Sequence, residues 1–220
     1  MIAPTGVLRA SINLGNPVLA RGTASDPAGV TVDLAREVGR RLGVPVELVC
    51  FTAARDSFAA LTDGRADLGF LAIEPARATQ VAFTDPYVVI EGVYCVPASS
   101  PIDAPADVDR PGVRIGVKEG SAYDLFLTRT LSRATLVRGA EGVDVFADQD
   151  LEVGAGIRQP VTSYVADRDG LRVLESAFMQ IRQACAVPLD RPAEDVAWLS
   201  ALVAELSENG FVAEALAATG

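Results

Sequence analysis

The stretch LTDGRADLGFLAIEPARATQVAFTDPYV (61–88) places an apolar strand directly before a proline and a single arginine. The strand signal covers residues 66–73, and Arg77 follows one turn after it. Open α/β sheets bind ligands beyond the carboxyl ends of their strands, and a guanidinium matches a carboxylate with two parallel N–H bonds. We therefore predict that Arg77 holds a small anion. The alternative is a surface arginine paired with Glu74 or Asp85.

Strand and helix signals alternate on both sides of this stretch. Apolar residues with period two predict strands, and an apolar face with period 3.6 predicts helices. The predicted strands are 7–13, 44–51, 66–73, 87–102, 113–117, 134–138, 171–175 and 178–190; the predicted helices are 31–43, 56–64, 121–131, 141–149, 192–208 and 210–218; a weaker strand and helix share 153–167. This order predicts an α/β fold in which mostly parallel sheets are flanked by helices.

Two long β-rich segments divide the alternation into two lobes. Lobe 1 is predicted to be discontinuous, with residues 1–88 and 187–220, and lobe 2 to comprise 96–178. The connecting segments 89–95 and 179–186 are predicted to be hinge strands. Two lobes joined by two strands are typical of proteins that close on a ligand.

The composition excludes several classes of function. The chain has 220 residues, a formal net charge of −10 and no histidine. The acidic balance argues against nucleic acid as a partner. The lack of histidine removes the usual Ser-His and Cys-His catalytic systems and most zinc sites. Cys50, Cys95 and Cys185 lie in apolar runs without CxxC spacing, which favours buried free thiols over a disulfide or metal ligands. We expect no metal and no cofactor.

The sequence also bears on localisation. Residues 1–20 lack the basic and continuous apolar regions of a signal peptide, and no run of about 18 apolar residues predicts membrane insertion. The chain as written is expected to be cytoplasmic if it is full length, and a chain whose leader has been removed would look the same. We expect a monomer.

Three blocks of the sequence resemble a known family. GVTVDLAREVGRRLGVPVELV (29–49), the stretch 61–88 and VRIGVKEGSAYDLFL (113–127) are similar to the type 2 periplasmic binding proteins, specifically the amino-acid-type (family 3) solute-binding proteins of ABC transporters. The resemblance covers nearly the whole chain. It implies a two-lobed fold, non-catalytic binding of a small solute in the cleft between the lobes, a periplasmic location and an ABC permease as partner.

The resemblance also implies roles for individual residues. Arg77 takes the place of the arginine that binds the ligand carboxylate, and Phe70 and Ala72 of the preceding strand are counted with the ligand-binding residues. Gly120 and Ser121 open a helix whose N–H groups and dipole favour an anion. The simpler reading of Ser121 is a helix cap, with Asp124 three residues later.

The sequence departs from the family at four positions. Ala72 replaces the hydroxyl residue that donates to the carboxylate, and Asn16 and Ala54 replace the aromatic clamp, although Asn16 could still form a hydrogen bond. Arg158 stands where the family has an aspartate for the ligand's ammonium group. Arg77 and Arg158, with the helix start at Ser121, therefore predict a small anionic solute that is amino-acid-like or a dicarboxylic or oxo acid: either a dianion or a carboxylate with a neutral polar tail. The alternative is that Arg158 faces solvent or pairs with an acid of the segment 148–152.

Two other functions stay open at this stage. A cyclohexadienyl-dehydratase-like enzyme would use Glu91 or Glu119 as a general acid, with a pKa raised by burial. The ligand-sensing half of a transcriptional regulator would need a DNA-binding segment, whereas the chain starts directly at its first strand.

Overall fold

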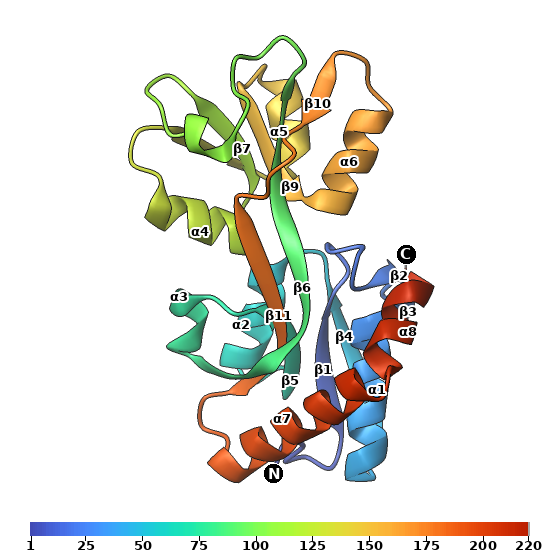
Figure 1. The fold of residues 1–220 in the computed structure, drawn as a ribbon. Coiled ribbons are helices and arrows are strands. Elements are labelled where there is room, and N and C mark those ends of the chain that lie inside the picture. Colours follow the sequence, from blue (N-terminus) through green and yellow to red (C-terminus); the bar gives the residue numbers. More distant parts are fainter. Residues whose placement is uncertain (220) are drawn as a thin grey trace. The chain divides into compact units, whose positions relative to one another are not determined.

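The computed structural model describes residues 1–219 and divides the chain into two compact units (Figure 1). Unit 1 comprises Met1–Val88 and the chain from Arg182 onward, and unit 2 comprises Val89–Ile181. The chain passes from one unit to the other within β6 (Val81–Pro97) and within β11 (Met179–Pro188). That these strands act as hinges stays a prediction.

The boundary within β11 follows from its pairing. Its residues 183–186 pair antiparallel with β5 (Leu68–Ala72), with Gln183 opposite Ala72 and Ala186 opposite Gly69. Residues 182–186, which the sequence analysis assigns to a connecting strand, therefore group with unit 1.

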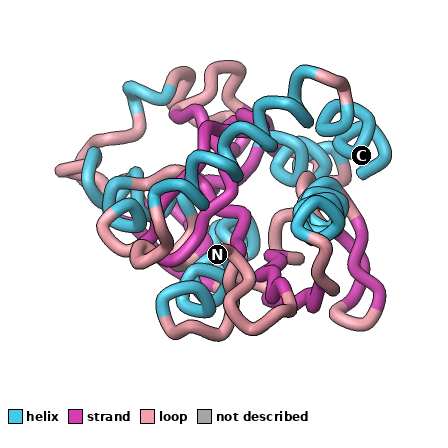
Figure 2. The backbone as a smooth tube through the Cα atoms, turned by 90° about the horizontal axis from the view of Figure 1, so that it is seen from below, coloured by secondary structure: helices cyan, strands magenta, loops and turns pink. Residues whose placement is uncertain are grey.

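The sheet of unit 1 has β1 (Leu8–Asn13) between two parallel neighbours, β4 (Val46–Phe51) and β5, and β11 lies beyond β5. The helices of this unit are α1 (Val30–Leu42), α2 (Ala54–Thr62), α3 (Pro75–Ala78), α7 (Ala193–Glu208) and α8 (Phe211–Thr219). Figure 2 shows the strands in magenta running between helices in cyan.

The two faces of this sheet pack in separate apolar clusters. Leu68 and Phe70 of β5 belong to the larger cluster, which contains buried residues of α1, α7 and α8. Leu71 belongs to a smaller cluster with Ala60 and Leu61 of α2. Successive side chains of a strand point to opposite faces, so an uninterrupted apolar strand is what a sheet covered on both faces requires.

The sheet of unit 2 has β7 (Arg114–Lys118) between its parallel neighbours β8 (Thr135–Gly139) and β9 (Val153–Ile157). β6 pairs antiparallel with β9 and with the short β10 (Leu171–Val173). The helices are α4 (Ala122–Thr130), α5 (Gly142–Asp148) and α6 (Arg158–Ala166), with a 3₁₀ turn at Pro105–Asp107. The α/β class and helix-flanked, mostly parallel arrangement predicted from the sequence are confirmed.

The sequence analysis missed three short elements and one strand start. The missed elements are the hairpin of β2 (Arg21–Thr23) and β3 (Asp26–Ala28) and the single turn of α3. β6 begins at Val81 instead of residue 87, because the Thr-Asp-Pro run at 84–86 reads as a turn. Among residues 1–219, no helix has the length and apolarity needed to cross a bilayer.

The three cysteines are free thiols. Cys95 and Cys185 are buried, and burial raises their pKa values to about 11 and about 12. Cys50 is only partly buried, in contrast to the expectation, because β4 is the outer strand of its sheet.

Candidate functional site

Arg77 is a buried charge at the carboxyl edge of the unit 1 sheet. Its exposed fraction is 3%, and its NH1 donates to the carbonyl of Ala72 at 3.4 Å. Burial lowers its pKa to about 10, against the opposing effect of Glu74, so the guanidinium stays charged at neutral pH. The position follows from the local sequence, since Pro75 starts the single turn of α3 directly after β5. Arg77 is therefore not on the surface, although Glu74, one of the two acids named in that alternative, does interact with it.

Asn16, Phe70 and Ala72 lie near the same edge, because β1 and β5 are parallel neighbours. Asn16 is buried, and its Oδ1 has no hydrogen-bond partner within residues 1–219. Ala72 is also buried. Phe70 belongs to the core and packs edge-on against Tyr87, with 6.2 Å between ring centroids. Ligand contacts of these three residues stay predictions.

In unit 2, Gly120 and Ser121 form a closed helix cap at the start of α4. Ser121 Oγ accepts the backbone N–H of Asp124 at 3.1 Å, and the Asp124 carboxylate accepts that of Gly120 at 2.9 Å. The N–H of Ser121 donates to the carbonyl of Lys118. The capping interpretation is confirmed. The sequence predicted free N–H groups at this helix start, and this prediction needs correction. The N–H groups of Gly120, Ser121 and Asp124 are bonded within the protein, so at most those of Ala122 and Tyr123 could meet a ligand.

Sequence reasoning missed the partner that holds this cap. Arg138 Nε lies 3.0 Å from Oδ1 of the buried Asp124, and Arg138 NH2 donates to Thr128 Oγ1 at 2.7 Å. The strand register explains the contact, because β7 and β8 pair with Val117 opposite Arg138, and this register is not visible in the sequence alone. The carboxylate that fixes Gly120 is thereby neutralised within unit 2.

Arg158 is the first residue of α6 and forms an ion pair with Glu91. Its NH2 also donates to the carbonyl of Glu175 at 2.9 Å. The register explains the pair, because β6 and β9 run antiparallel with Gly92 opposite Ile157. Arg158 has a partner, and that partner is Glu91 instead of an acid of the segment 148–152. The alternative drawn from the sequence is therefore wrong. The positive charge predicted for this edge is matched by a negative one.

Neither of the two acids named for catalysis is buried. Glu119 is exposed. Glu91 is engaged with Arg158, and its side chain has an exposed fraction of 37%. A general acid held protonated at neutral pH needs an apolar, water-poor setting.

A family model decides the identity of the chain. The model described as bacterial extracellular solute-binding proteins, family 3, matches residues 13–217. The chain belongs to this family. The resemblance drawn from the sequence is thereby confirmed. A search of curated protein sequences found no match.

Solved structures show the fold of this solute-binding protein. The binding component of an ABC transporter from Wolinella succinogenes, complexed with lysine, is 20% identical with a TM-score of 0.79, covering 96% of this chain and 94% of that one. A mutant of ArgBP from T. maritima is 21% identical with a TM-score of 0.78, covering 98% and 95%. An ancestral amino acid-binding protein, a precursor of cyclohexadienyl dehydratase, is 21% identical with a TM-score of 0.77, covering 97% and 94%. The predicted periplasmic-binding-protein-like fold is confirmed.

Proposed function

We propose that this solute-binding protein binds a small carboxylate through Arg77. The observation that carries the proposal is a guanidinium that is 3% exposed and charged at the carboxyl edge of an open α/β sheet. A desolvated guanidinium is stabilised by an anionic acceptor, and a carboxylate can take two of its N–H bonds at once. Ser121 and Arg158 of unit 2 are proposed as further contacts.

The ion pair of unit 2 refines the ligand class. Because Glu91 matches the charge of Arg158, this edge offers neither a free cation for a second carboxylate nor a free acid for an ammonium group. We therefore favour a monocarboxylate whose remaining part is polar and neutral, such as an oxo acid, over a dicarboxylic acid. The lysine and arginine named for similar structures are the competing class.

The test is calorimetry with the purified chain and four probes: a 2-oxo acid, a dicarboxylate, lysine and arginine. The proposal expects the 2-oxo acid to bind best. Arg77→Met should weaken binding about thirtyfold or more, because truncating one partner of a buried charge pair costs about 2–5 kcal/mol. Arg77→Lys should recover only part, since a lysine cannot form the paired N–H geometry.

A surface arginine provides the matched control. Arg110 is half exposed and pairs with Asp107 on the 3₁₀ turn, so Arg110→Gln should bind like the parent chain. Equal affinity of Arg77→Met and the parent would contradict the carboxylate proposal. If lysine or arginine binds more tightly than the 2-oxo acid, the proposed ligand class is wrong, whereas the proposed role of Arg77 in binding a carboxylate is unaffected.

We also propose that binding is non-catalytic and serves an ABC permease. Mass spectrometry should recover the bound ligand chemically unchanged after prolonged incubation. Conversion of a cyclohexadienyl acid, lost in Glu119→Gln, would instead establish the dehydratase alternative. A permease gene beside the coding sequence, and ligand-dependent binding to that permease in vesicles, would test the partner.

A further inference from the structure

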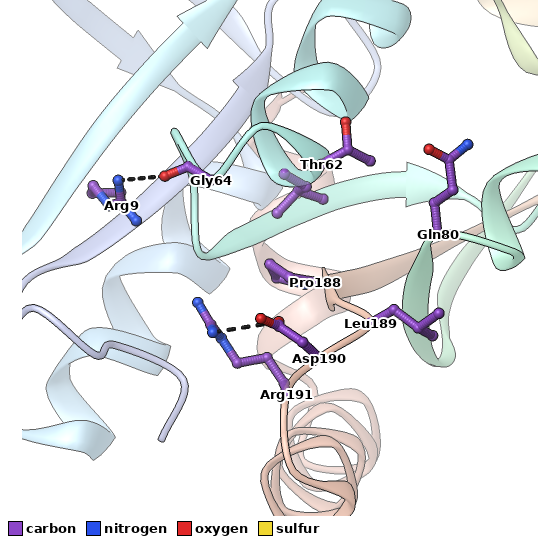
Figure 3. Close-up of a pocket in the computed structure, with 9 residues that line it drawn as sticks. Arg9, Thr62, Gly64, Gln80, Pro188, Leu189, Asp190 and Arg191 are labelled. Carbon is purple, nitrogen blue, oxygen red and sulfur yellow. Dashed lines mark hydrogen bonds and ion pairs between the residues drawn. The ribbon is translucent and has the colours of Figure 1, made fainter.

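A hollow of about 530 Å³ lies at the opposite edge of the unit 1 sheet from Arg77. Its walls come from Arg9 of β1, from the end of α2 and the turn after it, from Gln80 just before β6, and from the segment 188–191 after β11 (Figure 3). Since β1 and β5 are parallel and β11 is antiparallel to β5, the start of β1 and the end of β11 meet at the amino edge of β5. The lining does not include Arg77, Asn16, Phe70 or Ala72, although the backbone N–H of Gln80 donates to the carbonyl of Arg77 at 2.9 Å.

A buried carboxylate holds two guanidinium groups at this wall. Asp67 is fully buried and accepts Arg9 Nε at 2.9 Å and Arg9 NH2 at 2.8 Å. Arg191 NH2 donates to the same carboxylate at 3.2 Å. Arg9 and Arg191 therefore share this one buried carboxylate, and Asp190 is a second acid beside Arg191. Asp190 lies 3.5 Å from Arg191 NH1, but its side chain is 80% exposed, so water screens this pair.

Arg191 keeps donors for a ligand. A guanidinium carries five N–H donors, and the Nε of Arg191 is buried with no hydrogen-bond partner within residues 1–219. A buried donor without an acceptor is unfavourable. Arg9 is already fixed, because its NH1 donates to the carbonyl of Gly64 at 2.7 Å (Figure 3). A small rotation of Arg191 would let its N–H groups meet an anionic oxygen in the hollow.

Part of the remaining wall is apolar. Leu61, Pro188 and Leu189 line it beside the polar side chains of Thr62 and Gln80, and Leu189 has an exposed fraction of 56%. Apolar side chains beside two guanidinium groups suit a ligand with one anionic end and a short hydrocarbon part.

We propose that this hollow is a second ligand site, separate from that of Arg77, which binds a short-chain carboxylate. The carboxylate oxygens accept N–H groups of Arg191, the charge of Arg9 lies beside them, and the alkyl part lies against Pro188 and Leu189.

The test is an NMR titration of the ¹⁵N-labelled full chain with sodium butanoate, with sodium phosphate and sodium chloride at equal ionic strength as comparisons. Butanoate should cause saturable shifts of the Arg191 Nε–H signal and of the backbone amides of Gly64 and Leu189. The same shifts should appear in Arg77→Met, which separates this site from the one in the proposed function.

Two variants probe the two halves of the hollow. Arg191→Gln should weaken butanoate binding about tenfold or more, the equivalent of one charge-assisted hydrogen bond. Leu189→Ser leaves the Asp67 cluster untouched and should weaken binding of butanoate but not of acetate. No saturable shift, an equal response to chloride or phosphate, loss of the response in Arg77→Met, or unchanged affinity in both hollow variants would overturn the proposal.

Discussion

Glu91 of β6 and Arg158 of α6 form an ion pair within unit 2, because the antiparallel register of β6 and β9 brings residues 91 and 158 together. The arginine stands where the family resemblance implies an acid, so the substitution inverts one charge and Glu91 restores the balance. Both side chains are about one third exposed, at 32% and 37%. Pairs of this kind contribute only about 0–1 kcal/mol to stability, so the effect of the pair on ligand charge is the quantity to test.

Glu91→Gln and Arg158→Gln should shift dicarboxylate affinity in opposite directions. Removal of the acid leaves the guanidinium uncompensated, which strengthens binding of a dianion, and removal of the guanidinium weakens it. Calorimetry with one dicarboxylate, at low and at high salt, measures the affinity of both variants and of the parent chain. Unchanged affinity in both variants would remove Arg158 from the proposed contacts.

Tyr87→Phe should leave the free energy of unfolding unchanged or raise it. The Tyr87 hydroxyl is buried without a hydrogen-bond partner among residues 1–219, so its loss removes an unfavourable group. Thr84 on the same strand is the matched control. Its Oγ1 accepts the N–H of Cys185 at 3.1 Å, and Thr84→Val should cost about 1–3 kcal/mol because that N–H becomes unsatisfied. Denaturant unfolding of both variants measures their free energies of unfolding. A decrease for Tyr87→Phe as large as that for Thr84→Val would contradict the expectation.

Gly116→Ala should destabilise unit 2 by about 1–3 kcal/mol through overpacking. A Cβ at Gly116 would overlap the carbonyl oxygen of Gly142 and lie 2.9 Å from the backbone N of Phe146, so α5 would have to move away from β7. The control is Gly139→Ala, whose Cβ meets the end of the Val145 side chain, which can rotate. Thermal melts that show equal losses for both glycines would disprove the close approach of helix and strand.

Asp109 should make stability depend on pH in the acid range. Its carboxylate accepts the backbone N–H groups of Ser132, Arg133 and Ala134, and these bonds lower its pKa from 3.8 to about 2. A depressed folded-state pKa stabilises the native form above the unfolded value. The stability advantage of the parent over Asp109→Asn should therefore be constant above about pH 5 and shrink between pH 4 and pH 2. Melts of both chains across this range measure it; a pH-independent difference would exclude the carboxylate as its source.

Local patterns were sufficient to predict the fold class and most elements. The apolar face of α1, with Leu34 and Val38 buried and Gly43 in the left-handed conformation at its end, is a signal that a sequence carries without knowledge of its neighbours. The same holds for the Ser121 cap and for the position of Arg77 after β5.

What the sequence could not show depends on strand register. Arg158 with Glu91, Arg138 with Asp124, and Arg9 with Asp67 each join residues that are distant along the chain. Charge signs can suggest many such pairs, and only the pairing of particular strand residues selects among them. The ligand class was predicted from Arg158 taken as an unpaired cation. Its partner Glu91 can be found only from the register of the strands.

The discontinuity of unit 1 bears on how the polypeptide folds as it leaves the ribosome. Unit 2 is one uninterrupted span, whereas β5 lacks its neighbour β11, and the larger apolar cluster of unit 1 lacks α7 and α8, until the whole of unit 2 has been synthesised. Domains usually fold in order of emergence. Here the first segment of unit 1 precedes unit 2 and its second segment follows it, so residues 1–88 expose an uncovered apolar surface until α7 and α8 have emerged.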